Sequence, residues 1–142
     1  MLRLALAAKP PTGFIRDIVV TASGKREEAL DIKHGGLLPV IDLARYAALK
    51  GSIQANHTID RLRAATAQGI LKAQTARVLE EAFELFSALR LDHQVTQIEQ
   101  GREPDDLLDP REFDPLTRRY LRNAFREVAA VQKSFASELG SR

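Results

Sequence analysis

Asp31, Lys33 and His34 form the first group of residues with the types and spacing to bind a ligand. They stand directly before a double glycine, Gly35-Gly36, which precedes a predicted helix. Backbone amides at a helix N-terminus can bind an anion, and the two basic side chains add positive charge. The stretch lacks the full spacing of a phosphate-binding loop. We therefore interpret it as a sharp turn that contributes to a binding site.

A second polar group continues the apolar stripe of a predicted helix. At 100° per residue, Leu79, Ala82, Phe83 and Phe86 share one face, and the same face then carries Arg90, His93, Gln94 and Gln97. Polar side chains on an inward face must find hydrogen-bond partners, so the pattern favours a polar pocket at one end of a helical bundle. The alternative is that the stripe reaches solvent at this point.

Arg45 completes the candidate substrate-binding residues, and it can pair with Asp42 three positions earlier. We predict neither catalytic residues nor a metal site in this chain. The three histidines lack metal-ligand spacing, and there is no Gly-x-Ser-x-Gly motif. Gly51-Ser52 with Asp60 imitates a nucleotidyltransferase signature, but Leu62 occupies the place of the second acid that two-metal chemistry needs.

The composition points to closely packed helices. The chain has 142 residues, enough for one domain, with 44% apolar residues, 6% aromatic residues and no Trp. Its core must therefore be aliphatic and rich in alanine. The absence of Cys suits a reducing cytoplasm, and no apolar run is long enough to cross a bilayer. From these two features we expect a soluble cytoplasmic protein. The net charge of +2 is small, so we expect the protein to bind no nucleic acid.

Periodicity and terminal residues predict a mainly α fold, a helical bundle of four or five helices with a small N-terminal β-hairpin. Strand 14–20 and a returning strand at 30–33 would form the hairpin, after a helical stub at 1–9. Four main helices are predicted. The first runs from near Pro39 to about residue 49, and the second follows an N-cap at Thr58 and ends near residue 68. The third runs from near Ala73 to about residue 100, and the fourth follows an N-cap at Asp114 and ends near residue 139. An acidic loop, 102–110, joins the last two.

The last predicted helix carries four arginines, Arg118, Arg119, Arg122 and Arg126, on the side opposite its apolar face. Such a stripe can bind phosphates or an acidic partner, or it can be a solvated surface. No aromatic residue lies among these arginines, so base stacking is not supported.

Several separated motifs occur in order at residues 13–17, 30–45, 58–62, 82–85, 89–94 and 121–125, with the acidic loop 102–110 before the last of them. Together they resemble the DUF294 C-terminal family of nucleotidyltransferase substrate-binding domains, and the resemblance covers residues 11–135. It implies a single substrate-binding domain at 11–139, preceded by a stub or linker at 1–10 from an upstream catalytic domain.

The resemblance also implies a role. Such a domain follows a catalytic nucleotidyltransferase domain in signal-transduction proteins, often with CBS pairs and a cyclic-nucleotide-binding domain upstream. The expected role is non-catalytic, to help bind the nucleotide or the acceptor substrate. No cofactor is expected in this chain, whereas Mg²⁺ and a nucleoside triphosphate are implied for the catalytic domain. The alternative is a helical module for protein–protein interaction or homodimerisation without a small ligand. An independent enzyme ranks last.

Overall fold

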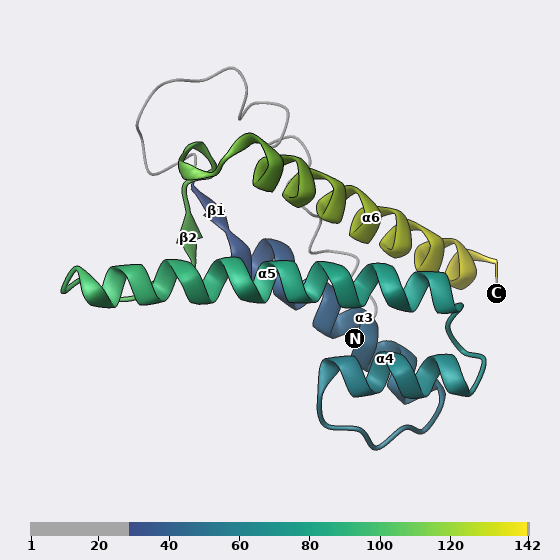
Figure 1. Cartoon of the computed structure of the whole chain (residues 1–142). Coiled ribbons are helices and arrows are strands. Elements are labelled where there is room, and N and C mark those ends of the chain that lie inside the picture. Colours follow the sequence, from purple (N-terminus) through teal and green to yellow (C-terminus); the bar gives the residue numbers. More distant parts are fainter. Residues whose placement is uncertain (1–28, 142) are drawn as a thin grey trace.

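The computed structural model describes residues 29–141, which fold around four α-helices (Figure 1). These are α3 (Leu38–Lys50), α4 (Thr58–Ala67), α5 (Ala73–Glu99) and α6 (Pro115–Gly140). The shorter elements are strands β1 (Leu30–Asp31) and β2 (Leu107–Leu108), the π-helical turn η2 (Lys33–Leu37) and the 3-10 turn η3 (Pro110–Glu112). The predicted mainly α fold with a small antiparallel sheet on its N-terminal side is confirmed. None of the helices described here is long and apolar enough to cross a membrane.

Local sequence signals set the ends of the helices. Asp114 caps α6, because its Oδ1 accepts a hydrogen bond of 2.9 Å from the Thr117 amide. Gly69 and Gly101 follow α4 and α5 with φ of 71° and 70°, the left-handed conformation that glycine adopts without strain. The prediction of Thr58 as an N-cap is wrong by one residue. His57 holds the cap position without a side-chain bond, and Thr58 begins the helix.

The core is aliphatic and alanine-rich, with one central aromatic pair. The rings of Phe86 on α5 and Phe125 on α6 are both fully buried, with centroids 4.9 Å apart. These two helices run in opposite directions (Figure 1). The α3 face of Val40, Leu43, Ala44, Ala47 and Ala48 is also buried, and α3 packs against α4, α5 and α6. Small side chains on this face allow the close contacts that a dense core requires.

The two-stranded sheet joins the start of the described chain to the acidic loop. Leu30 pairs with Leu108 and Asp31 with Leu107, in antiparallel register. The Ile32 amide extends the pairing by donating to the Asp106 carbonyl at 3.0 Å. Of the strand expected at 30–33, only Leu30–Asp31 is a strand, because Ile32 and Lys33 are already helical, and its partner among the described residues lies in the acidic loop. The predicted strand 14–20 and helical stub 1–9 lie outside the described residues.

The prediction of a sharp turn at Gly35-Gly36 is wrong. The chain is already helical at Ile32 and runs through η2 into α3, and the Leu38 amide bonds to the Lys33 carbonyl. Asp31 caps this segment, since its Oδ1 accepts from the His34 amide at 2.9 Å. Gly36 is buried, and a Cβ atom added to it would lie 3.1 Å from Phe86 Cδ2 and 3.2 Å from Ile32 Cδ1. The glycine therefore allows close packing of η2 on α5.

Replacing Gly36 by Ala should destabilise the fold. Alanine gains about 1 kcal/mol in intrinsic helix preference, but forcing a methyl group against Phe86 and Ile32 costs about 1–3 kcal/mol. We expect a net loss of about 1 kcal/mol in the free energy of unfolding, measured by urea denaturation. Gly140→Ala is the matched control, because no atom lies within 4 Å of the added Cβ. Equal stability of the two variants would contradict the packing role of Gly36.

Candidate functional site

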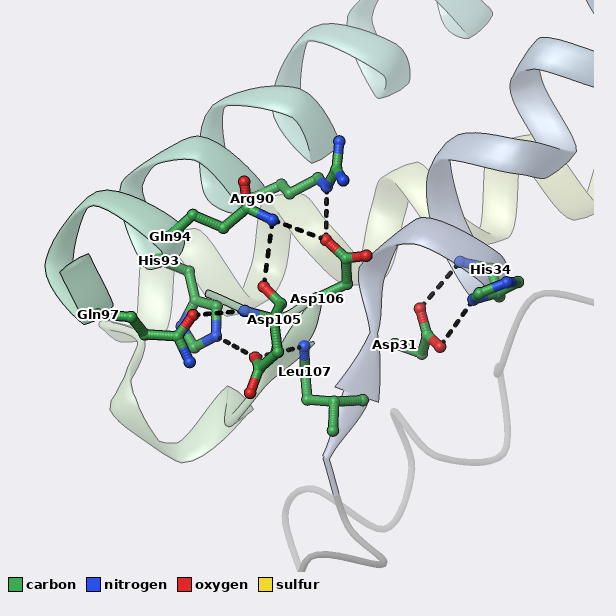
Figure 2. Close-up of polar contacts among 9 residues, drawn as sticks. All are labelled: Asp31, His34, Arg90, His93, Gln94, Gln97, Asp105, Asp106 and Leu107. Atoms are coloured by element: carbon green, nitrogen blue, oxygen red, sulfur yellow. Dashed lines mark hydrogen bonds and ion pairs between the residues drawn. The ribbon is translucent and has the colours of Figure 1, made fainter. Parts of the chain in front are cut away.

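The C-terminal half of α5 presents a polar face, and the loop after α5 folds back along it (Figures 1 and 2). Gln97 begins the contact: its Oε1 accepts from the Asp105 amide at 2.8 Å, and its carbonyl accepts from the Arg102 amide at 2.8 Å. Only 2% of Gln97 is exposed. A buried glutamine thus anchors both ends of the turn that leads into β2.

Asp106 receives two further donors from α5. Its Oδ1 accepts from Arg90 Nε at 2.6 Å and from Gln94 Nε2 at 3.0 Å. Gln94 Nε2 also lies 3.3 Å from the Asp105 carbonyl oxygen. The Arg90 side chain is 36% exposed, and among the described residues its terminal guanidinium nitrogens have no hydrogen-bond partner. In Figure 2 one of these nitrogens points away from Asp106, and the other lies beside Nε.

Asp105 binds His93 and its own strand. His93 Nε2 lies 2.8 Å from Asp105 Oδ1, which also accepts from the Leu107 amide at 3.0 Å. Burial raises the pKa of Asp105, but the hydrogen bonds from His93 and Leu107, with the Gln97 side chain beside them, outweigh burial and hold the pKa below its ordinary 3.8. Asp105 is therefore an anion at neutral pH.

One buried donor in this cluster has no partner. Gln97 Nε2 makes no hydrogen bond within the part of the chain that the structure describes. Its orientation is fixed, because Oε1 is already bonded to the Asp105 amide. An unpaired buried polar group costs about 1–3 kcal/mol, so such groups are uncommon outside functional sites.

The predicted N-terminal group lies next to this cluster. Asp31 pairs with Leu107 across the sheet, which puts the Asp31–His34 contact on the far side of Asp106 from Arg90 (Figure 2). His34 Nδ1 lies 2.9 Å from Asp31 Oδ2, and Lys33 is exposed. The two polar groups that the sequence singled out therefore lie on elements joined by the β1–β2 pairing, on opposite sides of Asp106.

Arg45 does not belong to this cluster. It lies 11 residues after His34, about 16 Å along a helix. Its Nη1 is 3.6 Å from Asp42 Oδ1, so the predicted pair is formed at the surface.

Sequence reasoning missed the two residues that organise the site, Asp105 and Asp106. The acidic character of their loop was visible, but a loop carries no periodicity that assigns its side chains to a helix face. The available signal was charge: an Asp pair follows closely after a helix face with Arg90 and His93. Among residues 29–141, no group of three or more His, Cys, Asp or Glu side chains is arranged to hold a metal ion.

Comparison with known families gives one result. A family model described as "Putative nucleotidyltransferase substrate binding domain" matches residues 1–139. Searches of the curated proteins and of the solved structures return no match.

Replacing Asp105 by Asn should produce a stability loss that depends on pH. A carboxyl whose pKa is depressed in the folded state stabilises the fold above its unfolded-state pKa, and this contribution disappears as the pH falls through the folded-state value. Asp105 is about a third exposed, so solvent screening limits the expected loss near neutral pH to about 1 kcal/mol.

The measurement is the free energy of unfolding in urea, from pH 7 to below the unfolded-state pKa of about 3.9. The difference between parent and variant should shrink toward zero at the acid end. Asp92→Asn, an exposed change on the same helix, is the control and should leave stability nearly constant. A difference that grows as the pH falls would contradict the role assigned to Asp105.

Proposed function

We propose, from the premise that the chain belongs to the DUF294 C-terminal family of nucleotidyltransferase substrate-binding domains, that it binds the nucleotide or the acceptor substrate for a catalytic domain. In this proposal the chain performs no catalysis itself. Its partner is an upstream nucleotidyltransferase domain in a signal-transduction protein. CBS pairs and a cyclic-nucleotide-binding domain are proposed as further neighbours in that protein.

The observation that carries the proposal is the arrangement of Arg90. Asp106 holds one edge of the guanidinium through Nε, while the terminal nitrogens have no partner among the described residues and the side chain is about one-third exposed. A guanidinium fixed in this way needs little further ordering to bind a phosphate or carboxylate through two parallel bonds. This arrangement favours an anionic group as the ligand.

The neighbouring residues have two roles in this proposal. His34, oriented by Asp31, lies on the far side of Asp106 from Arg90, so it and the exposed Lys33 add positive charge near the site and do not contact the anion together with Arg90. The α5 side chains His93, Gln94 and Gln97 hold Asp105 and Asp106 in place, so they position Arg90 indirectly. Arg45 is about three helical turns from His34, and we leave it out of the proposed site.

Metal chemistry belongs to the partner in this proposal. Two-metal nucleotidyl transfer needs clustered carboxylates. The carboxylates of Asp105 and Asp106 are engaged by side chains of α5, and no metal cluster occurs among residues 29–141. Mg²⁺ and a nucleoside triphosphate are therefore assigned to the catalytic domain.

Titration calorimetry with ATP, GTP, CTP and UTP tests the proposal on the chain alone and on the chain fused to its catalytic domain. Lys33→Ala should weaken binding of the preferred nucleotide severalfold, and Arg90→Ala about tenfold or more, because a hydrogen bond to a charged group contributes about 1.5–3 kcal/mol.

Arg77→Ala is the matched control, since Arg77 is exposed on the same helix and lies outside the cluster. Circular dichroism checks that Arg90→Ala still folds. The proposal fails if neither protein form binds any nucleotide, or if Lys33→Ala and Arg90→Ala both bind as the parent does.

A second candidate function is homodimerisation through α5. Leu91, Val95 and Ile98 are 64%, 44% and 62% exposed and recur at helical spacing on one face. Contiguous exposed apolar side chains mark interaction surfaces more often than isolated ones do. The alanine face of α3 cannot have this role, because it is buried within the chain itself.

Analytical ultracentrifugation tests this alternative. The double variant Leu91→Glu/Ile98→Glu should convert a dimer into a monomer, because it places charges on the apolar face. Leu49→Glu, at another exposed leucine, should leave the dimer intact. A parent protein that is monomeric at all concentrations would reject homodimerisation and leave the nucleotide-binding proposal standing.

A further inference from the structure

One side of α6 carries a continuous basic stripe. Its five members are Arg118, Arg119, Arg122, Arg126 and Lys133. At 100° per residue they fall within an arc of about 100° that borders the face of the core residues Leu121, Phe125 and Val128, with Arg118 about 20° from Phe125. Arg119, Arg126 and Lys133 are exposed, and Arg118 and Arg122 are half-buried.

Residues 29–141 supply no counter-charge to the basic stripe. None of its five side chains forms an ion pair with any of the described residues, whereas Arg45, Arg63 and Arg90 each have a carboxylate partner. The acidic residues of α6, Glu127 and Glu138, lie outside the arc, and Glu138 is 3.9 Å from Lys50. Like charges four residues apart, such as Arg118, Arg122 and Arg126, repel one another and destabilise an isolated helix. An anionic partner would remove this repulsion.

The residues between the cations favour a phosphate backbone over other anionic partners. Ala129, Ala136 and Ser137 lie in the same arc and offer little apolar surface, so the cations would supply the binding energy and not apolar burial against a protein or a bilayer. Arginine, which supplies four of the five cations, binds phosphate oxygens bidentately. From Arg118 to Lys133 the stripe spans about 22 Å, the axial length of six or seven nucleotides of a duplex strand.

We infer that the basic stripe of α6 binds the phosphate backbone of a nucleic acid duplex without reading its sequence. No aromatic residue lies in the arc, so base stacking does not contribute. The net charge of the whole chain is small and argued against nucleic acid, but the net charge does not show that these five cations gather on one face of α6. This inference is independent of the function proposed above.

Fluorescence anisotropy with a labelled 16-base-pair DNA duplex tests the inference on the full chain. The dependence of log K on log salt should have a slope of about −0.9 for each phosphate contacted, or about −4.5 for the five cations of the stripe. Arg122→Ala/Arg126→Ala should weaken binding about tenfold or more at low salt and make the slope about 1.8 less steep. Alanine suits a helix interior, so this variant should fold.

Lys72→Ala/Arg77→Ala removes the same charge from exposed positions at the start of α5, outside the basic stripe, and should bind the duplex nearly as the parent does. An equal loss in both double variants would overturn the inference, since it would show a net-charge effect. No duplex binding at low salt would overturn it as well, as would stripe-dependent binding to phosphatidylserine vesicles in place of the duplex. Calorimetry of the Arg122→Ala/Arg126→Ala variant with the preferred nucleotide separates the proposals, because the Arg90 site should be unaffected.

Discussion

The contact between Asp105–Asp106 and the polar face of α5 determines how the rest of the site is arranged. Arg90, His93, Gln94 and Gln97 would otherwise lie on a helix that extends beyond the core with few partners. The loop supplies one backbone amide, one carbonyl and two carboxylates to these four side chains. Because this contact holds the loop against α5, β2 lies where Leu107 and Leu108 can pair with Asp31 and Leu30. The contact of Asp105–Asp106 with α5 thus also determines the position of β1 and of η2, which follows it.

The small sheet and the buried Gly36 hold the same segment from two sides. On one side, Ile32 donates its amide to Asp106, which continues the strand pairing into the helix start. On the other, Gly36 lets η2 approach Phe86, whose ring packs on Phe125. The polar site and the aromatic core therefore share one support, the segment from Leu30 to Leu37. A change in the packing around Phe86 should for this reason reach Asp31 and His34, although neither touches the ring.

Local signals in the sequence predicted the helices, and non-local contacts account for what it missed. Asp114, Gly69 and Gly101 act on their immediate neighbours, so their effect on helix ends could be derived from position alone. The polar face of α5 could be predicted from the helical spacing of its side chains. Its partners were not, because the pairing of Asp105 with His93 depends on how the intervening turn folds. Gly35-Gly36 was interpreted as a turn for the same reason: the ring of Phe86, which requires the glycine, lies far along the chain.

The distribution of charge separates two surfaces that the net charge of +2 cannot distinguish. On α5, Arg90 and His93 face Asp106 and Asp105, so local positive charge is largely neutralised and only the far edge of one guanidinium is left for a ligand. On α6, the basic stripe faces no carboxylate among the described residues. A cation that is already paired, such as Arg90, binds only ligands of suitable shape, because the hydrogen bond that fixes its side chain also fixes the directions of its remaining N–H groups. An unneutralised stripe attracts any polyanion over a distance of about 8–10 Å at moderate salt, with little demand on shape. The two proposals therefore assign different ligands to the two surfaces, a small anion to Arg90 and an extended one to α6.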